Sequence, residues 1–178
     1  MLAIQGSLAM ARRAILRQAS AAALLVAAIG GAAATPAAAA TDQRSIPARL
    51  AGTTWRAVTI AGRPVRPITD VNFFGDPVTV NPKPTLTFQV DEFGMVPVGA
   101  GCNSHAAFLS IVGHQIRISI VASTLMACLP KVMDQERRFI AALRSAKRFT
   151  FDGPFLVLHP SGRGAPTRFV RVKAAERR

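Results

Sequence analysis

Features that would mark an enzyme are scarce in this chain. It has two cysteines and no Cys-x-x-Cys pair, so a catalytic thiol is poorly supported. It also has no Gly-x-Ser-x-Gly elbow of the kind that carries a nucleophilic serine. Acidic residues are few, with 9 Asp and Glu against 22 Lys and Arg, and the adjacent pair Asp91-Glu92 falls in a predicted turn. We therefore expect no catalytic residues, no metal site and no cofactor.

Negative charge is missing altogether from Met1 to Ala40. This segment contains three arginines, then a short apolar stretch, then an Ala-x-Ala run, which is the order of a secretory signal peptide. We predict a signal peptide over residues 1–40, with cleavage near Ala40, and a periplasmic or secreted protein. Met10 is an alternative start. A membrane anchor is the competing reading, but residues 21–34 fall short of the ~20 that a span needs.

The remaining segment, residues 41–178, has the length of a single domain with flexible ends. It carries 19 basic and 9 acidic residues, a net charge of +10. Such an excess favours attraction to polyanions. For an exported protein the candidate partners are anionic envelope lipids, lipopolysaccharide or an acidic periplasmic protein. We expect no nucleic-acid partner and a monomer.

Alternating apolar residues and β-branched residues predict strands, and a stripe at helical spacing predicts one helix over Leu129–Ala146. Pro130 suits the first turn of that helix. Strands before and after one helix predict an α+β domain with a mostly antiparallel sheet. The predicted strands are 53–60, 85–90, 95–100, 115–120, 155–159 and 167–172.

Two stretches lack a regular pattern. Residues 64–84 contain five prolines and predict an irregular excursion, which Phe73 and Phe74 are expected to hold against the core. Residues 102–113 lose the strand period, and no element is assigned to them. Trp55 lies in an apolar strand and is expected in the core.

Cys102 and Cys128 are the strongest chemical feature. Export favours a disulfide between them, which would close a loop of about 27 residues and contribute about 3.5 kcal/mol through the unfolded state. Two buried free thiols are the alternative. A metal set could be drawn by adding His105 and His114, but the spacing matches no zinc pattern.

The possible binding residues fall into two groups. Asn103 and His105 lie next to the first cysteine; Ser104 and His105 are adjacent on an extended chain and face opposite sides, so they do not form a hydrolase pair. Basic residues on the helix and on the last strand could form one cationic patch, or simply a solvated face. They are Arg137, Arg138, Arg144, Lys147, Arg168 and Arg171, with Arg148 and Lys173 beside them.

The sequence resembles the META domain, the HslJ-like and heat-shock-associated family of small bacterial envelope proteins. The likeness covers nearly all of residues 50–172. It rests on Gly101-Cys102-Asn103, on Ser123-Thr124-Leu125-Met126-Ala127-Cys128 and on the segments 50–55, 84–88, 139–143 and 155–158. Departures are the missing lipobox cysteine, Ser104-His105 after the Asn, and a long insertion, Ile68 to Lys83.

The resemblance implies a compact α+β domain in which a curved, mostly antiparallel β-sheet packs against one main α-helix. It also implies a role in envelope stress or antibiotic tolerance, and it supplies no catalytic residues. We therefore expect an exported non-enzymatic domain that binds or stabilises an envelope component. The alternative is an inhibitor of, or an enzyme acting on, the cell wall, with the insertion as an inhibitory loop.

Overall fold

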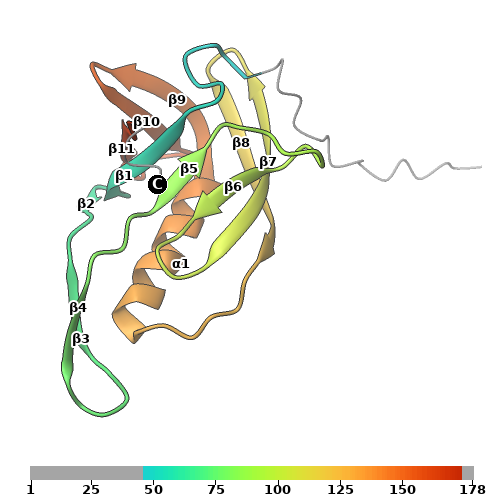
Figure 1. Cartoon of the computed structure of the whole chain (residues 1–178). Coiled ribbons are helices and arrows are strands. Elements are labelled where there is room, and N and C mark those ends of the chain that lie inside the picture. Colours follow the sequence, from blue (N-terminus) through green and yellow to red (C-terminus); the bar gives the residue numbers. More distant parts are fainter. Residues whose placement is uncertain (1–45, 174–178) are drawn as a thin grey trace, which may run out of the picture. The chain divides into compact units, whose positions relative to one another are not determined.

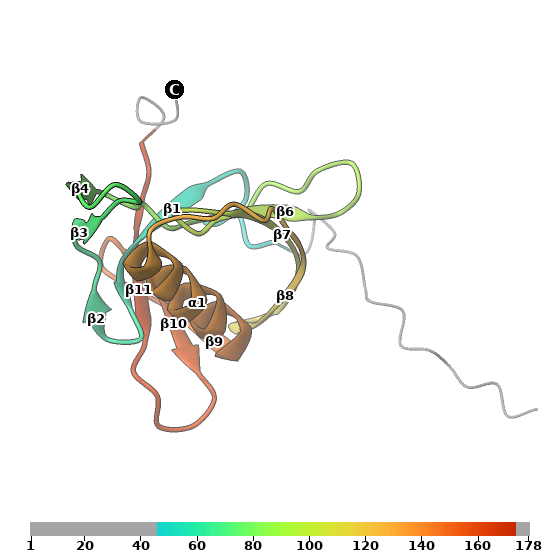
Figure 2. The ribbon, with the colours of Figure 1, turned by 90° about the horizontal axis from the view of Figure 1, so that it is seen from below.

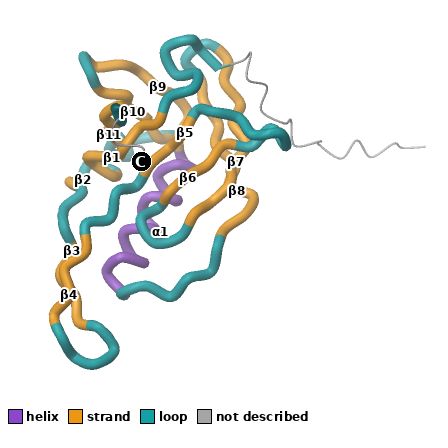
Figure 3. The backbone as a smooth tube through the Cα atoms, viewed as in Figure 1, coloured by secondary structure: helices purple, strands orange, loops and turns teal. Residues whose placement is uncertain are grey.

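Strands dominate the computed structural model, which describes residues 46–173. The predicted signal peptide, its cleavage site and Met10 lie outside the described residues. The described residues contain one helix, which is drawn in purple among the strands in Figure 3. The elements are β1 (Thr54–Ile60), β2 (Arg63–Pro64), β3 (Ile68–Val71), β4 (Pro77–Val80), β5 (Thr85–Thr87), β6 (Val96–Gly99), β7 (Ser104–Val112), β8 (Gln115–Ser123), α1 (Pro130–Ser145), β9 (Ala146–Asp152), β10 (Phe155–Pro160) and β11 (Thr167–Arg171).

The main sheet closes on itself as an eight-stranded barrel (Figure 1). The strands follow the order β1-β5-β6-β7-β8-β9-β10-β11, and β11 returns to pair with β1. The predicted α+β fold, a curved, mostly antiparallel sheet packed against one main helix, is therefore wrong. About 47% of the described residues are strand, and the helix is a minor element.

Closure depends on β1, because both of its edges are paired. Trp55 lies opposite Leu86 of β5 on one side and opposite Arg171 of β11 on the other. An open sheet leaves unpaired N–H and C=O groups along its edges, and closure removes them. The strand pattern predicts the individual strands, but the pairing of the first with the last joins residues far apart in sequence.

The core fills the barrel and the space under the helix. Phe88, Phe139 and Phe169 are fully buried, and they come from the β5 side, α1 and β11. Trp55 is 3% exposed and its indole Nε1 donates to Thr53 Oγ1 at 2.7 Å, so its predicted place in the core is confirmed.

Helix α1 connects β8 to β9, two strands that pair at Gln115 and Arg148. Seen from below in Figure 2, α1 lies within the ring of strands. Its apolar stripe includes Phe139 and Leu143, both fully buried, as the helical spacing predicts. Pro130 begins the helix, which also agrees with the sequence.

Two strands of the barrel, β7 and β9, were not predicted. β7 occupies residues 104–112, where the sequence lacks a period because apolar residues stand on both of its faces: Leu109 and Ile111 are buried, and Val112 is 73% exposed. The register shift between Ala106 and Ala107 leaves the extra residue, Val121, on β8. β9 follows α1 directly. Its first basic residues, Lys147 and Arg148, are of the type expected at the C-terminal end of a helix, so the sequence does not indicate that a strand begins there.

The excursion over residues 64–84 is more regular than predicted. β3 and β4 form an antiparallel hairpin and a separate two-stranded sheet. Phe73 and Phe74 lie in its turn and are 98% and 84% exposed. The prediction that they hold this segment against the core is wrong, because the hairpin carries them away from the barrel (Figure 1).

Candidate functional site

A disulfide between Cys102 and Cys128 joins the β6–β7 connection to the segment before α1, with Cα atoms 6.2 Å apart. The predicted disulfide is thus present in the structure. Gly101, with φ of +102°, precedes it in the left-handed region that favours glycine, and a Cβ there would lie 2.7 Å from Pro82 Cβ. Glycine is therefore required at the start of the Gly-Cys-Asn motif.

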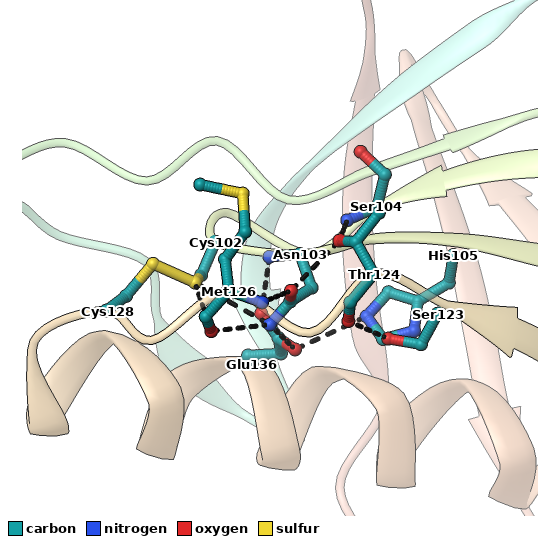
Figure 4. Close-up of polar contacts among 9 residues, drawn as sticks. All are labelled: Cys102, Asn103, Ser104, His105, Ser123, Thr124, Met126, Cys128 and Glu136. Carbon is teal, nitrogen blue, oxygen red and sulfur yellow. Dashed lines mark hydrogen bonds and ion pairs between the residues drawn. A yellow bond between two sulfur atoms is a disulfide. The ribbon is translucent and has the colours of Figure 1, made fainter.

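Asn103 is the centre of the polar network beside the disulfide (Figure 4). Its side-chain Oδ1 accepts hydrogen bonds from Thr124 Oγ1 at 2.9 Å and from Met126 N at 2.7 Å. Its Nδ2 donates to Glu136 Oε1 at 3.0 Å. One buried amide therefore ties the segment after β8 to the helix, which explains why the two cysteine motifs occur together.

Glu136 is the member of this network that the sequence does not single out. It is 6% exposed and accepts a second hydrogen bond, from Asn103 N at 2.8 Å. A buried carboxylate needs such donors because desolvation penalises its charge. Its position four residues after Val132 and four before Ile140, on the apolar side of the helix, is the signal that could have identified it.

His105 lies beside Glu136, and its side chain is 7% exposed. Its Nε2 is 3.4 Å from Glu136 Oε1, a distance without good hydrogen-bond alignment, and both ring nitrogens are buried without a partner in the described chain. The imidazole is enclosed between β7 and α1. The imidazole therefore lines one side of a shallow depression and is not accessible as a general base.

That depression has a volume of about 610 Å³ and lies along one side of α1. Its lining combines the two buried groups with exposed arginines of the helix. The residues are His105, Glu136, Arg137, Ile140, Ala141, Arg144 and Ser145. Of the predicted binding residues, the structure thus brings His105, Arg137 and Arg144 together, and Asn103 lies behind them in the network.

The other predicted cations lie elsewhere. Arg138 faces a hollow shared with Arg66 and Lys131, and Lys147 lies beside Arg117 near the β7–β8 turn. Arg168 on β11 pairs with Asp152 at 2.8 Å and lies over the Phe155 ring. Exposed Arg171 also lies on β11. The basic residues therefore occupy several places on the surface rather than one compact patch.

In the described residues, the fold assembles neither the Cys-His metal set nor a Ser104–His105 hydrolase pair. Both cysteines of the conceivable metal set are joined in the disulfide, so they supply no thiolate, and residues 46–173 contain no cluster of three potential ligands. Ser104 is exposed, whereas the His105 side chain is buried.

Within residues 46–173, no helix is both long and apolar enough to cross a membrane.

A family model described as the META domain matches residues 48–174. An NMR structure of a protein from Burkholderia xenovorans is similar, with 17% identity and a TM-score of 0.50, and the alignment covers 77% of this chain and 92% of that chain. A crystal structure of a DUF4847 family protein from Bacteroides vulgatus has 15% identity and a TM-score of 0.44, with 68% and 93% covered. Among curated proteins, none matches this chain.

The likeness to the Burkholderia protein concerns the fold alone, since the identity is low. The family match spans residues 48–174, which run from before β1 to beyond β11. They include the disulfide, Asn103 and Glu136. The resemblance seen in the sequence is confirmed, and the chain belongs to the META domain family.

Proposed function

We propose that this chain is an exported, non-enzymatic domain that binds an anionic component of the bacterial envelope. Export rests on the pattern of residues 1–40. Binding without catalysis is supported by the use of the polar groups near the cysteines: Asn103, Thr124 and Glu136 bond to one another. These groups hold the fold together and leave few polar atoms for a substrate.

The observation that carries the proposal is the exposed excess of positive charge. Cations outnumber acids about two to one in residues 41–178, and most of the predicted binding cations are exposed. Examples are Arg138, Arg144 and Lys147. A surface of this sign attracts polyanions over a distance set by the ionic strength, about 10 Å at ~0.1 M salt.

Salt dependence tests this proposal. The chain is incubated with envelope fragments, with lipopolysaccharide and with a soluble polyanion, at ionic strengths from about 0.02 M to about 0.5 M, and bound protein is measured after sedimentation or filtration. We expect binding at low salt that weakens as salt rises. Absence of binding to all three at the lowest salt would show the proposal to be wrong.

The inhibitor alternative keeps one specific observation in its favour. The insertion forms a protruding hairpin, β3–β4, and an inhibitor requires a projecting loop. The inhibitor alternative predicts that the chain slows a cell-wall hydrolase, and that shortening the hairpin between Ile68 and Val80 removes this inhibition. Unchanged inhibition by the shortened chain would exclude the hairpin as the inhibitory element.

A further inference from the structure

The β3–β4 hairpin is a two-stranded ribbon outside the barrel. Its strands pair from Ile68 opposite Val80 to Val71 opposite Pro77, and Thr69 and Thr79 share a hydrogen bond between their hydroxyl oxygens at 2.8 Å. Each strand has four residues. At about 3.3 Å per residue, the turn lies roughly 13 Å beyond the base of the hairpin.

Two aromatic side chains occupy the turn of this hairpin. Phe73 and Phe74 pack edge to face with ring centroids 5.6 Å apart, and Val71 beside them is 58% exposed. Rings exposed to this degree contribute almost nothing to the core and place apolar surface in water. Clustered apolar exposure of this kind marks a site of interaction with a protein or a membrane.

Several backbone N–H groups of the turn already have acceptors within the turn. Asn72 Oδ1 accepts from Phe74 N and from Asp76 N, both at 2.9 Å, and Gly75 N donates to Asn72 O at 3.1 Å. The one acidic side chain, Asp76, accepts from Asn72 Nδ2 at 3.3 Å. These internal hydrogen bonds lower the free-energy cost of moving the turn out of water, because a backbone group that leaves water without a partner is destabilising.

The base of the hairpin is held on the helix. Asp70 Oδ2 accepts a hydrogen bond from Lys131 N at 3.1 Å, and Lys131 Nζ donates to Thr69 O at 2.9 Å. The bond from Lys131 N is the main reason that the pKa of Asp70 is lowered. Asp70 thereby caps α1, which has no side-chain cap of its own, and the turn is presented in a fixed direction.

Three positive and two negative charges lie at that base. Arg66, Lys131 and Arg138 line a hollow of about 370 Å³ where the hairpin meets α1, together with Asp134, and Lys131 Nζ also lies 3.8 Å from Asp70 Oδ1. The apolar turn thus projects beyond a cationic collar, which we define as Arg66, Lys131 and Arg138. Interfacial segments bury apolar side chains about 5–10 Å deep in the headgroup region. A turn roughly 13 Å ahead of the collar would leave these cations near the headgroups.

We propose that the β3–β4 hairpin inserts Phe73 and Phe74 into an anionic phospholipid bilayer while the cationic collar contacts the headgroups. This inference rests on the proposed function and names its partner. Two Phe side chains offer only about 300–500 Å², less than the ~800 Å² per partner of a typical protein interface. A bilayer accepts apolar side chains singly, and its negative surface complements the collar.

The experiment measures partition of the chain between water and vesicles of phosphatidylglycerol with phosphatidylethanolamine, using phosphatidylcholine vesicles for comparison. The chain is expressed with its own N-terminal segment, so that every variant carries the same N-terminus. The test variant is the double substitution Phe73→Ser with Phe74→Ser. The matched control is Phe93→Ser, since Phe93 is 67% exposed in a different turn.

We expect the double variant to bind the anionic vesicles at least ~10-fold more weakly than the parent chain, because most of the inserted apolar area is removed. Phe93→Ser should change binding less than about twofold. Equal binding by the double variant overturns the insertion. Binding to the soluble polyanion but to no vesicle overturns the lipid partner and leaves the proposed function standing, whereas binding to neither overturns both.

Discussion

At the scale of single residues, Asn103 and Glu136 illustrate what a spacing pattern can and cannot predict. Asn103 was selected from the sequence as a binding residue because it follows Cys102. In the structure its side chain is occupied by Thr124, Met126 and Glu136. The partner that gives it this role is 33 positions away, and a contact of that range depends on the fold.

Replacement of Asn103 by Ala should destabilise the fold by about 2–4 kcal/mol, because it removes several buried hydrogen bonds and leaves the Glu136 carboxylate with one donor fewer. Urea unfolding of the variant measures this change. Asn81→Ala, at an exposed position, is the control and should stay within about 0.5 kcal/mol. Equal midpoints for the two variants would mean that the network contributes little.

His159 gives the fold a pH dependence in the mildly acidic range. Burial, and secondarily the charge of Arg148, lower its pKa from 6.5, and its Nε2 shares a hydrogen bond with Thr150 Oγ1 at 2.8 Å. Since the unfolded chain then binds the proton more readily, stability is retained above about pH 6.5 and falls as the pH drops below it.

Thermal unfolding between about pH 7.5 and pH 5.5 tests this dependence. The parent chain should lose stability toward the acidic end, and His159→Asn should lose less because it has no proton to bind at this position. A parent chain and variant with parallel pH profiles would contradict the assignment to His159.

At the scale of elements, the sequence predicts most strands and the helix because their apolar residues alternate in place. β1, β8, α1 and β10 follow that rule. β7 escaped prediction because apolar residues such as Phe108 and Val112 also occupy its less buried face, and alanines have low strand propensity. The Phe73–Phe74 pair is expected in the core because apolar residues are usually buried, but both residues lie in the turn of the hairpin and are exposed.

The disulfide belongs to this scale because it fixes the connection between β8 and α1. Replacing Cys102 and Cys128 together by Ser should lower the free energy of unfolding by about 3.5 kcal/mol, since the 26-residue separation constrains the unfolded chain. The parent chain unfolded with a reductant should match the variant. A loss below about 1 kcal/mol would indicate that the Asn103 network alone holds this connection.

At the scale of the whole molecule, the barrel was the feature that the sequence did not predict. Each strand is coded by a short pattern, but closure requires β1 to accept β5 on one edge and β11 on the other. No local pattern distinguishes that arrangement from an open curved sheet. The closed barrel leaves the β3–β4 hairpin as a separate small sheet, which is why its turn is available for binding.

The depth of that turn in a bilayer is the most direct measurement of the proposed binding mode. Phe74→Trp places an indole at the turn, while the native Trp55, 3% exposed, stays in the core as an internal reference. On binding anionic vesicles that contain brominated lipid, we predict that the variant's emission shifts to shorter wavelength and is quenched, and that the parent chain's emission is unchanged. Vesicle-bound variant with unquenched emission would contradict insertion of the hairpin.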